Sequence, residues 1–148
     1  MFSPFAPERR STMPVTYEVR NIMTEDLITV DADAPLMQAM KKMVEKNIGS
    51  VIVSRGDRPV GIVTERDILK DFCVNPRSGE SRIADIMSSP LITIDAGTSL
   101  GRAADLMAEK KIRRLLVTED DMIKGIVTER DIMRATLYVF KTLSDAWI

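Results

Sequence analysis

An eight-residue block that occurs twice in the chain contains the residues best suited to chemistry. It reads Gly-Ile-Val-Thr-Glu-Arg-Asp-Ile at residues 61–68 and again at 125–132. In each copy an aspartate follows a threonine by three positions, which is the spacing of a capping box at a helix start. A strand that leads directly into a helix also presents unpaired backbone N–H groups, which form a common phosphate site. The block therefore predicts helix capping, ligand binding, or both.

The acidic and hydroxyl side chains of the block fit the sugar and the phosphate of a nucleotide. Asp67 and Asp131, one turn into the expected helices, can each accept hydrogen bonds from both hydroxyls of a ribose, as carboxylates do in dinucleotide folds. The threonine can donate a hydrogen bond to phosphate and the arginine can pair with it, although an arginine at a helix start is more often simply solvated. These residues are Thr64 and Arg66 in the first block and Thr128 and Arg130 in the second.

The block is part of a longer internal duplication. When the sequence is shifted by 64 residues, 23 of the 49 positions from Ile22 to Lys70 are identical to their partners from Ile86 to Arg134, without a gap. Unrelated globular sequences would match at roughly one position in fifteen. A repeat of this length predicts two copies of one supersecondary unit rather than a solenoid.

Each copy has the same expected order of elements, which is strand, helix, strand, strand, helix. Short β-branched runs predict the first strand of each copy, and apolar residues at helical spacing behind Pro35 predict a helix over 35–47. A closing helix is expected after Thr64 and after Thr128. The expected strands are 27–30, 50–54 and 60–64 in the first copy and 91–94, 115–118 and 124–128 in the second.

This order predicts an α/β (α+β) fold made of tandem repeats. A single unit of about 50 residues is marginally stable, so we expect the two units to bury their open sheet faces against each other with pseudo-two-fold symmetry. The expected segments are an N-terminal tail at 1–18, the first repeat at 19–72, a linker at 73–81, the second repeat at 82–135 and a C-terminal helical tail at 136–148.

Composition narrows the classes of function. The chain has 21 basic and 22 acidic residues, so no overall field draws it to nucleic acid or to an anionic membrane. Histidine is absent and Cys73 is the single cysteine. This excludes catalytic triads that need a histidine, the usual zinc sites and an internal disulfide. No apolar run is long enough for a membrane span or a signal peptide. We therefore expect a cytoplasmic protein with no catalytic and no metal-binding residues.

The doubled Gly-h-h-Thr-x-x-Asp block (h is apolar), the Ile-Met pairs at 22–23 and 86–87 and the Leu-Ile-Thr strands that follow them resemble the CBS domain family. The likeness covers about Val19 to Ala135. It implies a stand-alone CBS pair, or Bateman module, that binds AMP, ADP, ATP or S-adenosylmethionine and uses no catalytic cofactor. It also implies a homodimer that regulates another protein, whose identity the sequence leaves open.

The resemblance further implies two ligand clefts, each formed by the closing block of one repeat and the opening segment of the other. One cleft would combine Thr128, Arg130 and Asp131 with Met23, Ile28, Ile48, Gly49 and Ser50. The other would combine Thr64, Arg66 and Asp67 with Met87, Ile92, Ile112, Arg113 and Arg114. Only the second has two adjacent guanidinium groups for charge-assisted bonds to phosphate, so the clefts should differ. The alternative is that the arginine pair lies at a strand edge, is solvated and contacts no phosphate.

Other functions compete with ligand binding. In a purely structural role the pair would dimerise or dock on another protein with empty clefts, using the aromatic residues Phe140 and Trp147 of the tail. Binding to nucleic acid through Arg9-Arg10 and Arg113-Arg114 is disfavoured by the balanced charge. An enzyme has the least support, because no nucleophile and base pair can be assembled from the residues present.

Overall fold

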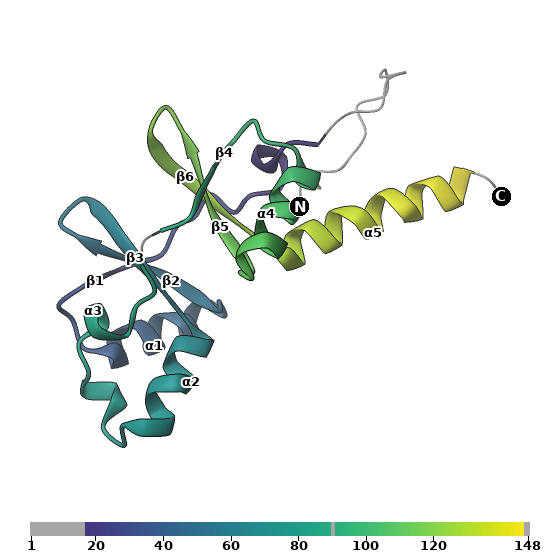
Figure 1. Ribbon diagram of the computed structural model, residues 1–148. Coiled ribbons are helices and arrows are strands. Elements are labelled where there is room, and N and C mark those ends of the chain that lie inside the picture. Colours follow the sequence, from purple (N-terminus) through teal and green to yellow (C-terminus); the bar gives the residue numbers. More distant parts are fainter. Residues whose placement is uncertain (1–16, 90, 147–148) are drawn as a thin grey trace. The chain divides into compact units, whose positions relative to one another are not determined.

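The computed structural model describes residues 17–89 and 91–146, which form two compact α/β units (Figure 1). The middle unit is Leu27–Leu91, and the terminal unit consists of the described residues up to Asp26 and those from Ile92 onward. Each unit contains one three-stranded sheet and its helices. The expected fold class and the expected order of strand, helix, strand, strand, helix are confirmed in both units.

The sheets of the two units have the same topology. In the middle unit the sheet order is β1-β2-β3, with β1 parallel to β2 and β2 antiparallel to β3. The terminal unit repeats this with β4-β5-β6. The strands are β1 (Thr29–Asp31), β2 (Ser50–Arg55), β3 (Arg58–Thr64), β4 (Thr93–Asp95), β5 (Arg114–Glu119) and β6 (Met122–Thr128). The first strand of each sheet therefore starts two residues later than the apolar run predicted.

The helices also match between units. They are α1 (Leu36–Lys46), α2 (Glu65–Val74) and α3 (Ile83–Ile86) in the middle unit, and α4 (Leu100–Lys110) and α5 (Glu129–Ala146) in the terminal unit. The 3-10 turns are η1 (Val19–Asn21) and η2 (Ser78–Glu80). Helix α1 buries Leu36, Ala39 and Met43, at the spacing that predicted it. Pro35 was expected in the first turn but is the N-cap, one position before the helix begins, and Asn47 ends the helix in the left-handed region at φ 53.

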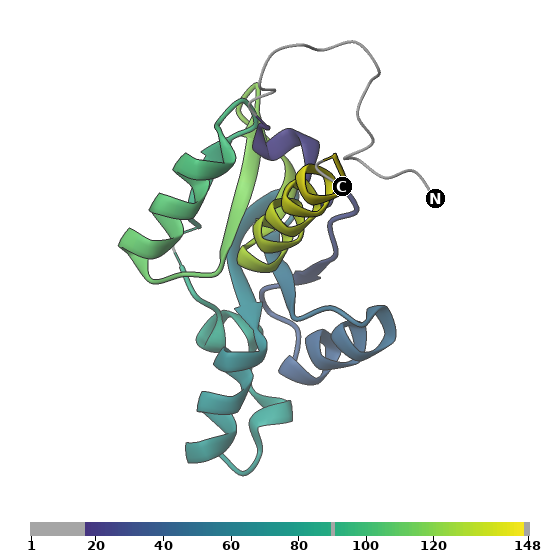
Figure 2. The same ribbon diagram turned by 90° about the vertical axis from the view of Figure 1, so that its right-hand side faces the viewer.

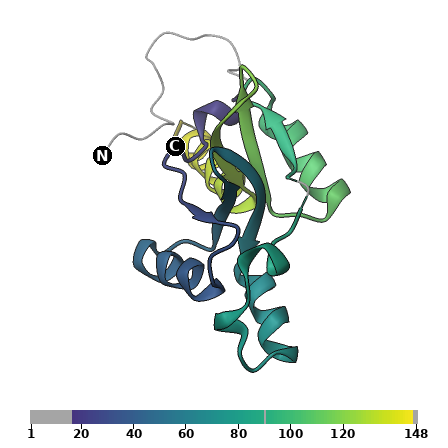
Figure 3. The ribbon, with the colours of Figure 1, turned by 90° about the vertical axis from the view of Figure 1, so that its left-hand side faces the viewer.

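The two repeats exchange their opening segments. The segment before β1 packs in the terminal unit, where Val19 is fully buried among residues of β4, α4, β5 and β6. The segment before β4 packs in the middle unit, where Ile83, the partner of Val19 under the 64-residue shift, is fully buried. Figure 2 shows the purple η1 beside the green elements of the second repeat, and Figure 3 shows α3 next to β3 and α2. Each compact unit is thus built from both sequence repeats.

Backbone hydrogen bonds hold the exchanged segments in place. In the terminal unit the Val19 N–H donates to the Thr98 carbonyl at 2.9 Å and the Arg20 N–H to the Ala96 carbonyl at 3.1 Å. The Arg20 guanidinium bridges Glu18 and Glu119, each at 2.7 Å, and these carboxylates raise the pKa of Arg20. The middle unit has the corresponding backbone bonds from Ile83 and Ala84 to the carbonyls of Ala34 and Ala32.

The segment 73–81, expected as a linker, is folded onto the middle unit. Helix α2 continues through Val74, and Ser78 is fully buried in η2. The Asp71 carboxylate accepts hydrogen bonds from the hydroxyls of Ser78 and Ser81. Because one carboxylate accepts from both serine hydroxyls, burial of this polar segment costs little.

Candidate functional site

The junction of β3 and α2 is a capping box. The Asp67 N–H donates to Thr64 Oγ1 at 3.2 Å, and Asp67 Oδ2 accepts from the Thr64 N–H at 2.9 Å. Asp67 Oδ2 also lies 3.0 Å from Thr64 Oγ1, whose hydroxyl donates to it. The helix-capping interpretation of the block is confirmed at this junction, and both side chains are half-buried. Capping uses one carboxylate oxygen of Asp67 and leaves the other for a different partner.

The junction of β6 and α5 repeats this geometry in the terminal unit. The Thr128 N–H donates to Asp131 Oδ2 at 2.9 Å, and the Asp131 N–H donates to Thr128 Oγ1 at 3.1 Å. Capping is therefore confirmed in the second copy as well. Asp131, like Asp67, is half-buried and directs one carboxylate oxygen to the start of its helix.

The glycine that opens each block, which capping does not explain, permits a close approach of the exchanged segment. Residues Thr24 and Ile126 exchange two backbone hydrogen bonds, at 2.9 and 3.0 Å, beside Gly125. A Cβ at Gly125 would lie 2.7 Å from Met23 Sδ and 2.9 Å from the Thr24 carbonyl oxygen. At Gly61 the corresponding distances are 2.6 Å to Met87 Sδ and 3.0 Å to the Ser88 carbonyl oxygen. The blocks thus place Met23 and Met87 against β6 and β3.

Asp67 has a partner that sequence reasoning missed. Ser88 Oγ lies 3.0 Å from Asp67 Oδ1 and donates a hydrogen bond to it. Ser88 follows Met87 directly, just as Thr24 follows Met23, so a hydroxyl residue at both positions of the repeat was the available signal. Among the described residues no hydrogen bond joins Thr24 Oγ1 to Asp131. The two junctions therefore differ in how many donors already surround the aspartate.

The other predicted site residues divide between the two units. Ile28 and Ile48 pack on the core of the middle unit, and Ile92 and Ile112 pack on that of the terminal unit. Around the junctions themselves, the Gly49 carbonyl accepts from the Glu65 N–H, and Ser50 pairs with Thr64 across β2 and β3. In the terminal unit the Arg113 carbonyl accepts from the Glu129 N–H, and Arg114 pairs with Thr128.

Three of the four arginines predicted to contact phosphate are exposed. Arg66 and Arg130 lie exposed in the first turns of α2 and α5. The Arg113 side chain is 80% exposed, and its Nε lies 3.9 Å from a Glu129 carboxylate oxygen, whereas Arg114 is half-buried at the start of β5. The predicted clefts combine residues of both units, so the pairing of Asp131 with Gly49-Ser50 and of Asp67 with Arg113-Arg114 stays a prediction. Arg9-Arg10 and Trp147 lie outside the described residues.

Comparison with known proteins decides the family. The CBS domain model matches this chain twice, at residues 19–73 and 83–138. The chain belongs to the CBS domain family. Its two family matches together contain both capping boxes and both exchanged segments, and CBS pairs are in general regulatory, non-catalytic ligand-binding modules.

Relatives of this CBS pair are known from archaea. An uncharacterized protein of Methanopyrus kandleri is 36% identical over 130 residues, which are 86% of this chain and 66% of that protein. An uncharacterized protein of Methanocaldococcus jannaschii is 36% identical over 132 residues, which are 79% of this chain and 31% of that protein. The chain thus spans less than two thirds of the length of these relatives.

A solved structure similar to the CBS pair contains adenosyl compounds. The CBS domain pair of protein MJ0100, in complex with 5′-methylthioadenosine and S-adenosyl-L-methionine, has a TM-score of 0.74 and 28% identity, and the match covers 85% of this chain and 98% of that one. An uncharacterized conserved protein of Pyrococcus horikoshii has a TM-score of 0.76 and 30% identity, over 84% and 95% of the two chains. Within the described parts of this chain, no helix is long and apolar enough to cross a membrane.

Proposed function

We propose that this CBS pair is a regulatory module that binds an adenosine-containing ligand, namely AMP, ADP, ATP or S-adenosylmethionine. The ribose hydroxyls are bound by Asp67 or Asp131, and the phosphate or its equivalent lies near the threonine and the arginines of the blocks. The module catalyses no reaction. Ligand occupancy changes the activity of a partner protein by favouring one of two arrangements of the module, and the effect is limited to the ligand's difference in affinity for them.

The geometry of the two aspartates carries this proposal. Each capping box fixes its aspartate through one carboxylate oxygen and holds the side chain at the start of a helix, where backbone dipoles favour an anionic ligand. A carboxylate has about four acceptor positions, so capping leaves room for hydroxyl donors. The solved relative with bound 5′-methylthioadenosine and S-adenosyl-L-methionine supports the adenosyl class of ligand.

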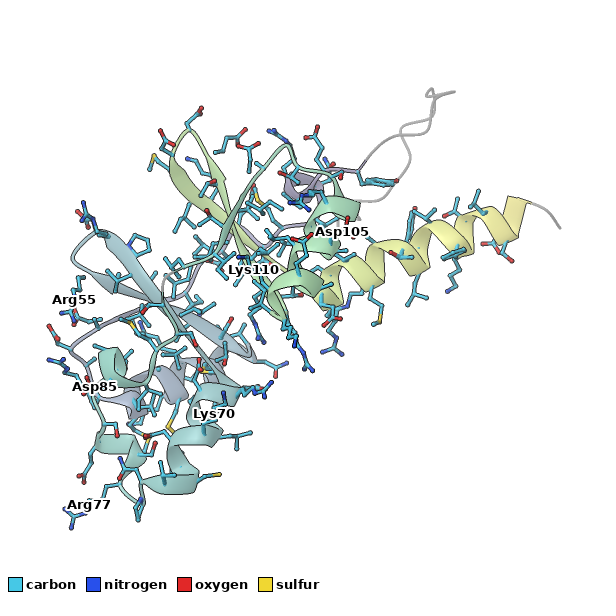
Figure 4. All side chains as sticks on the ribbon, viewed as in Figure 1. Arg55, Lys70, Arg77, Asp85, Asp105 and Lys110 are labelled. Carbon is cyan, nitrogen blue, oxygen red and sulfur yellow. The ribbon has the colours of Figure 1, made fainter. Side chains whose placement is uncertain are left out.

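Calorimetric titration with AMP, ATP and S-adenosylmethionine tests the proposal. The test variant carries Asp67→Asn and Asp131→Asn together, because an asparagine oxygen can still accept from the threonine N–H while the charge is lost. The control carries Asp85→Asn and Asp105→Asn, which remove two exposed carboxylates, one from each unit (Figure 4). We expect at least one ligand to bind the wild type and the control, and to bind the test variant more weakly by about tenfold or more. Equal binding to all three proteins would contradict the assigned residues.

A structural role without ligand is the second candidate, because helix α5 exposes large apolar residues. Leu137 is 60% exposed, Phe140 is 65% exposed and Leu143 is 53% exposed, and Figure 1 shows α5 extending past the strands of its own unit. Such a face favours association with another copy or a partner protein. A purely structural module would show no thermal shift with any adenosyl ligand, whereas a ligand at about 100 times its Kd adds about 2.7 kcal/mol to the free energy of unfolding.

We further propose that the module forms a homodimer whose interface includes α5. The dimer binds the ligand as well. Mass spectrometry of small molecules released from the purified protein identifies the ligand directly. Recovery of an adenosyl compound supports the regulatory function, and recovery of none, together with no thermal shift, supports the structural one.

A further inference from the structure

The hydrogen-bond environments of Asp67 and Asp131 are unequal. Three donors surround the Asp67 carboxylate, namely the Thr64 N–H and Thr64 hydroxyl at Oδ2 and the Ser88 hydroxyl at Oδ1. The Thr128 N–H donates to the Asp131 carboxylate, and in the described part of the chain neither the Thr128 hydroxyl nor the Thr24 hydroxyl does so. A carboxylate has about four acceptor positions, and the equivalent donors of the two repeats fill about three of them at Asp67 and about one at Asp131.

This difference matters for a ribose, which presents two hydroxyl donors side by side. Asp131 can accept both hydroxyls and keep its cap. Asp67 can accept both only if one of its two hydroxyl donors turns away, and Ser88 is the donor on Oδ1, the oxygen that the cap leaves free. The lost hydrogen bond subtracts from the binding free energy, because a bond to a charged group is stronger than one between neutral groups.

We propose that Ser88 is a specificity-determining residue, which occupies Asp67 in the ligand-free protein and weakens the ribose contact at the Asp67 site relative to the Asp131 site. This inference rests on the proposed function and adds to it a residue that sets how strongly each site selects for a ribose. Thr24, the partner of Ser88 under the 64-residue shift, makes no corresponding hydrogen bond to Asp131 in the described part of the chain.

The position of Ser88 makes the hydroxyl removable without disturbing the backbone. The Ser88 N–H and carbonyl form two hydrogen bonds with Ile62, at 2.8 and 3.1 Å, and alanine retains both. Ser88 is exposed, so its replacement leaves no cavity. Ser89, the exposed residue that follows it, supplies the matched control.

The experiment isolates each site in turn. Asp131→Asn leaves the Asp67 site, and Asp67→Asn leaves the Asp131 site. AMP and ATP are titrated by calorimetry against each variant, and 2′-deoxy-AMP and dATP, which lack one of the two ribose hydroxyls, are titrated for comparison. S-adenosylmethionine is titrated against the same variants.

Adding Ser88→Ala to Asp131→Asn should tighten binding at the Asp67 site by about two- to tenfold, while Ser89→Ala changes nothing. Adding Thr24→Ala to Asp67→Asn should leave the Asp131 site unchanged. The preference for the ribose over the deoxyribose ligand should be smaller at the Asp67 site and should rise when Ser88 is removed.

Unchanged or weaker binding in the Ser88→Ala variant would overturn the inference, and so would a stronger preference for ribose over deoxyribose at the Asp67 site than at the Asp131 site in the starting variants. These outcomes differ from failure of the proposed function, in which binding is absent or is insensitive to both Asp67→Asn and Asp131→Asn.

Discussion

The side chain of Met23 packs directly over Gly125, so that a Cβ at position 125 would lie 2.7 Å from the methionine sulfur. The methionine side chain is flexible, but the Thr24 carbonyl oxygen, 2.9 Å from the same Cβ position, cannot move easily. Both the N–H and the carbonyl of Thr24 are hydrogen-bonded to the backbone of Ile126. The first residue of each repeated block is therefore a glycine for reasons of space, independent of any ligand.

Gly125→Ala should lower the free energy of unfolding by about 1–3 kcal/mol, because the added methyl group overpacks the contact between β6 and the exchanged segment. Gly61→Ala should do the same in the middle unit, where the Ser88 carbonyl oxygen is 3.0 Å from the Cβ position. Chemical denaturation measures both. The control is Gly101→Ala in α4, which has nothing within 4 Å and should stabilise by about 0.5–1 kcal/mol. A neutral Gly125→Ala would show that Met23-Thr24 does not pack on β6.

Exchange of the opening segments predicts which unit each mutation weakens. Val19→Ala should destabilise the terminal unit by about 1–3 kcal/mol, although Val19 precedes the first repeat's strands in the sequence. Ile83→Ala should destabilise the middle unit instead, by about 2–5 kcal/mol. Hydrogen exchange by mass spectrometry resolves the two units. If Val19→Ala accelerates hydrogen exchange at the amides of β1–β3 and leaves those of β4–β6 unchanged, the opening segments are not swapped between the repeats.

The capping boxes predict a stability cost that is separable from ligand binding. Thr128→Ala should lower the free energy of unfolding by about 0.5–2 kcal/mol, since the Asp131 N–H loses its acceptor, and Thr128→Ser should retain most of the stability. Thermal denaturation without ligand measures both variants. If alanine and serine unfold alike, the Thr128 hydroxyl does not cap α5.

The exposed face of α5 predicts self-association. Phe140→Glu should weaken the proposed homodimer by about tenfold or more and leave the folded monomer intact, because Phe140 is 65% exposed and contributes little to the core of its unit. Sedimentation velocity over a range of protein concentrations measures the effect. Lys141→Glu, an exposed change of charge next to it, is the control. A wild-type chain that stays monomeric would contradict the dimer, whereas a dimer unaffected by Phe140→Glu would exclude α5 from its interface.

The sequence by itself determined the repeat, the order of elements and the capping boxes, because these depend on periodicity and on neighbours within four residues. Helix α1 follows from the spacing of Leu36, Ala39 and Met43, and the Thr64 and Asp67 pair caps α2 within one turn. The tertiary structure decided which sheet each opening segment joins, because two similar repeats offer nearly equivalent local signals for either choice. It also decided that Ser88 hydrogen-bonds to Asp67, 21 residues away, while in the described part of the chain Thr24 makes no such bond to Asp131. That difference depends on side-chain hydroxyl positions that only packing fixes.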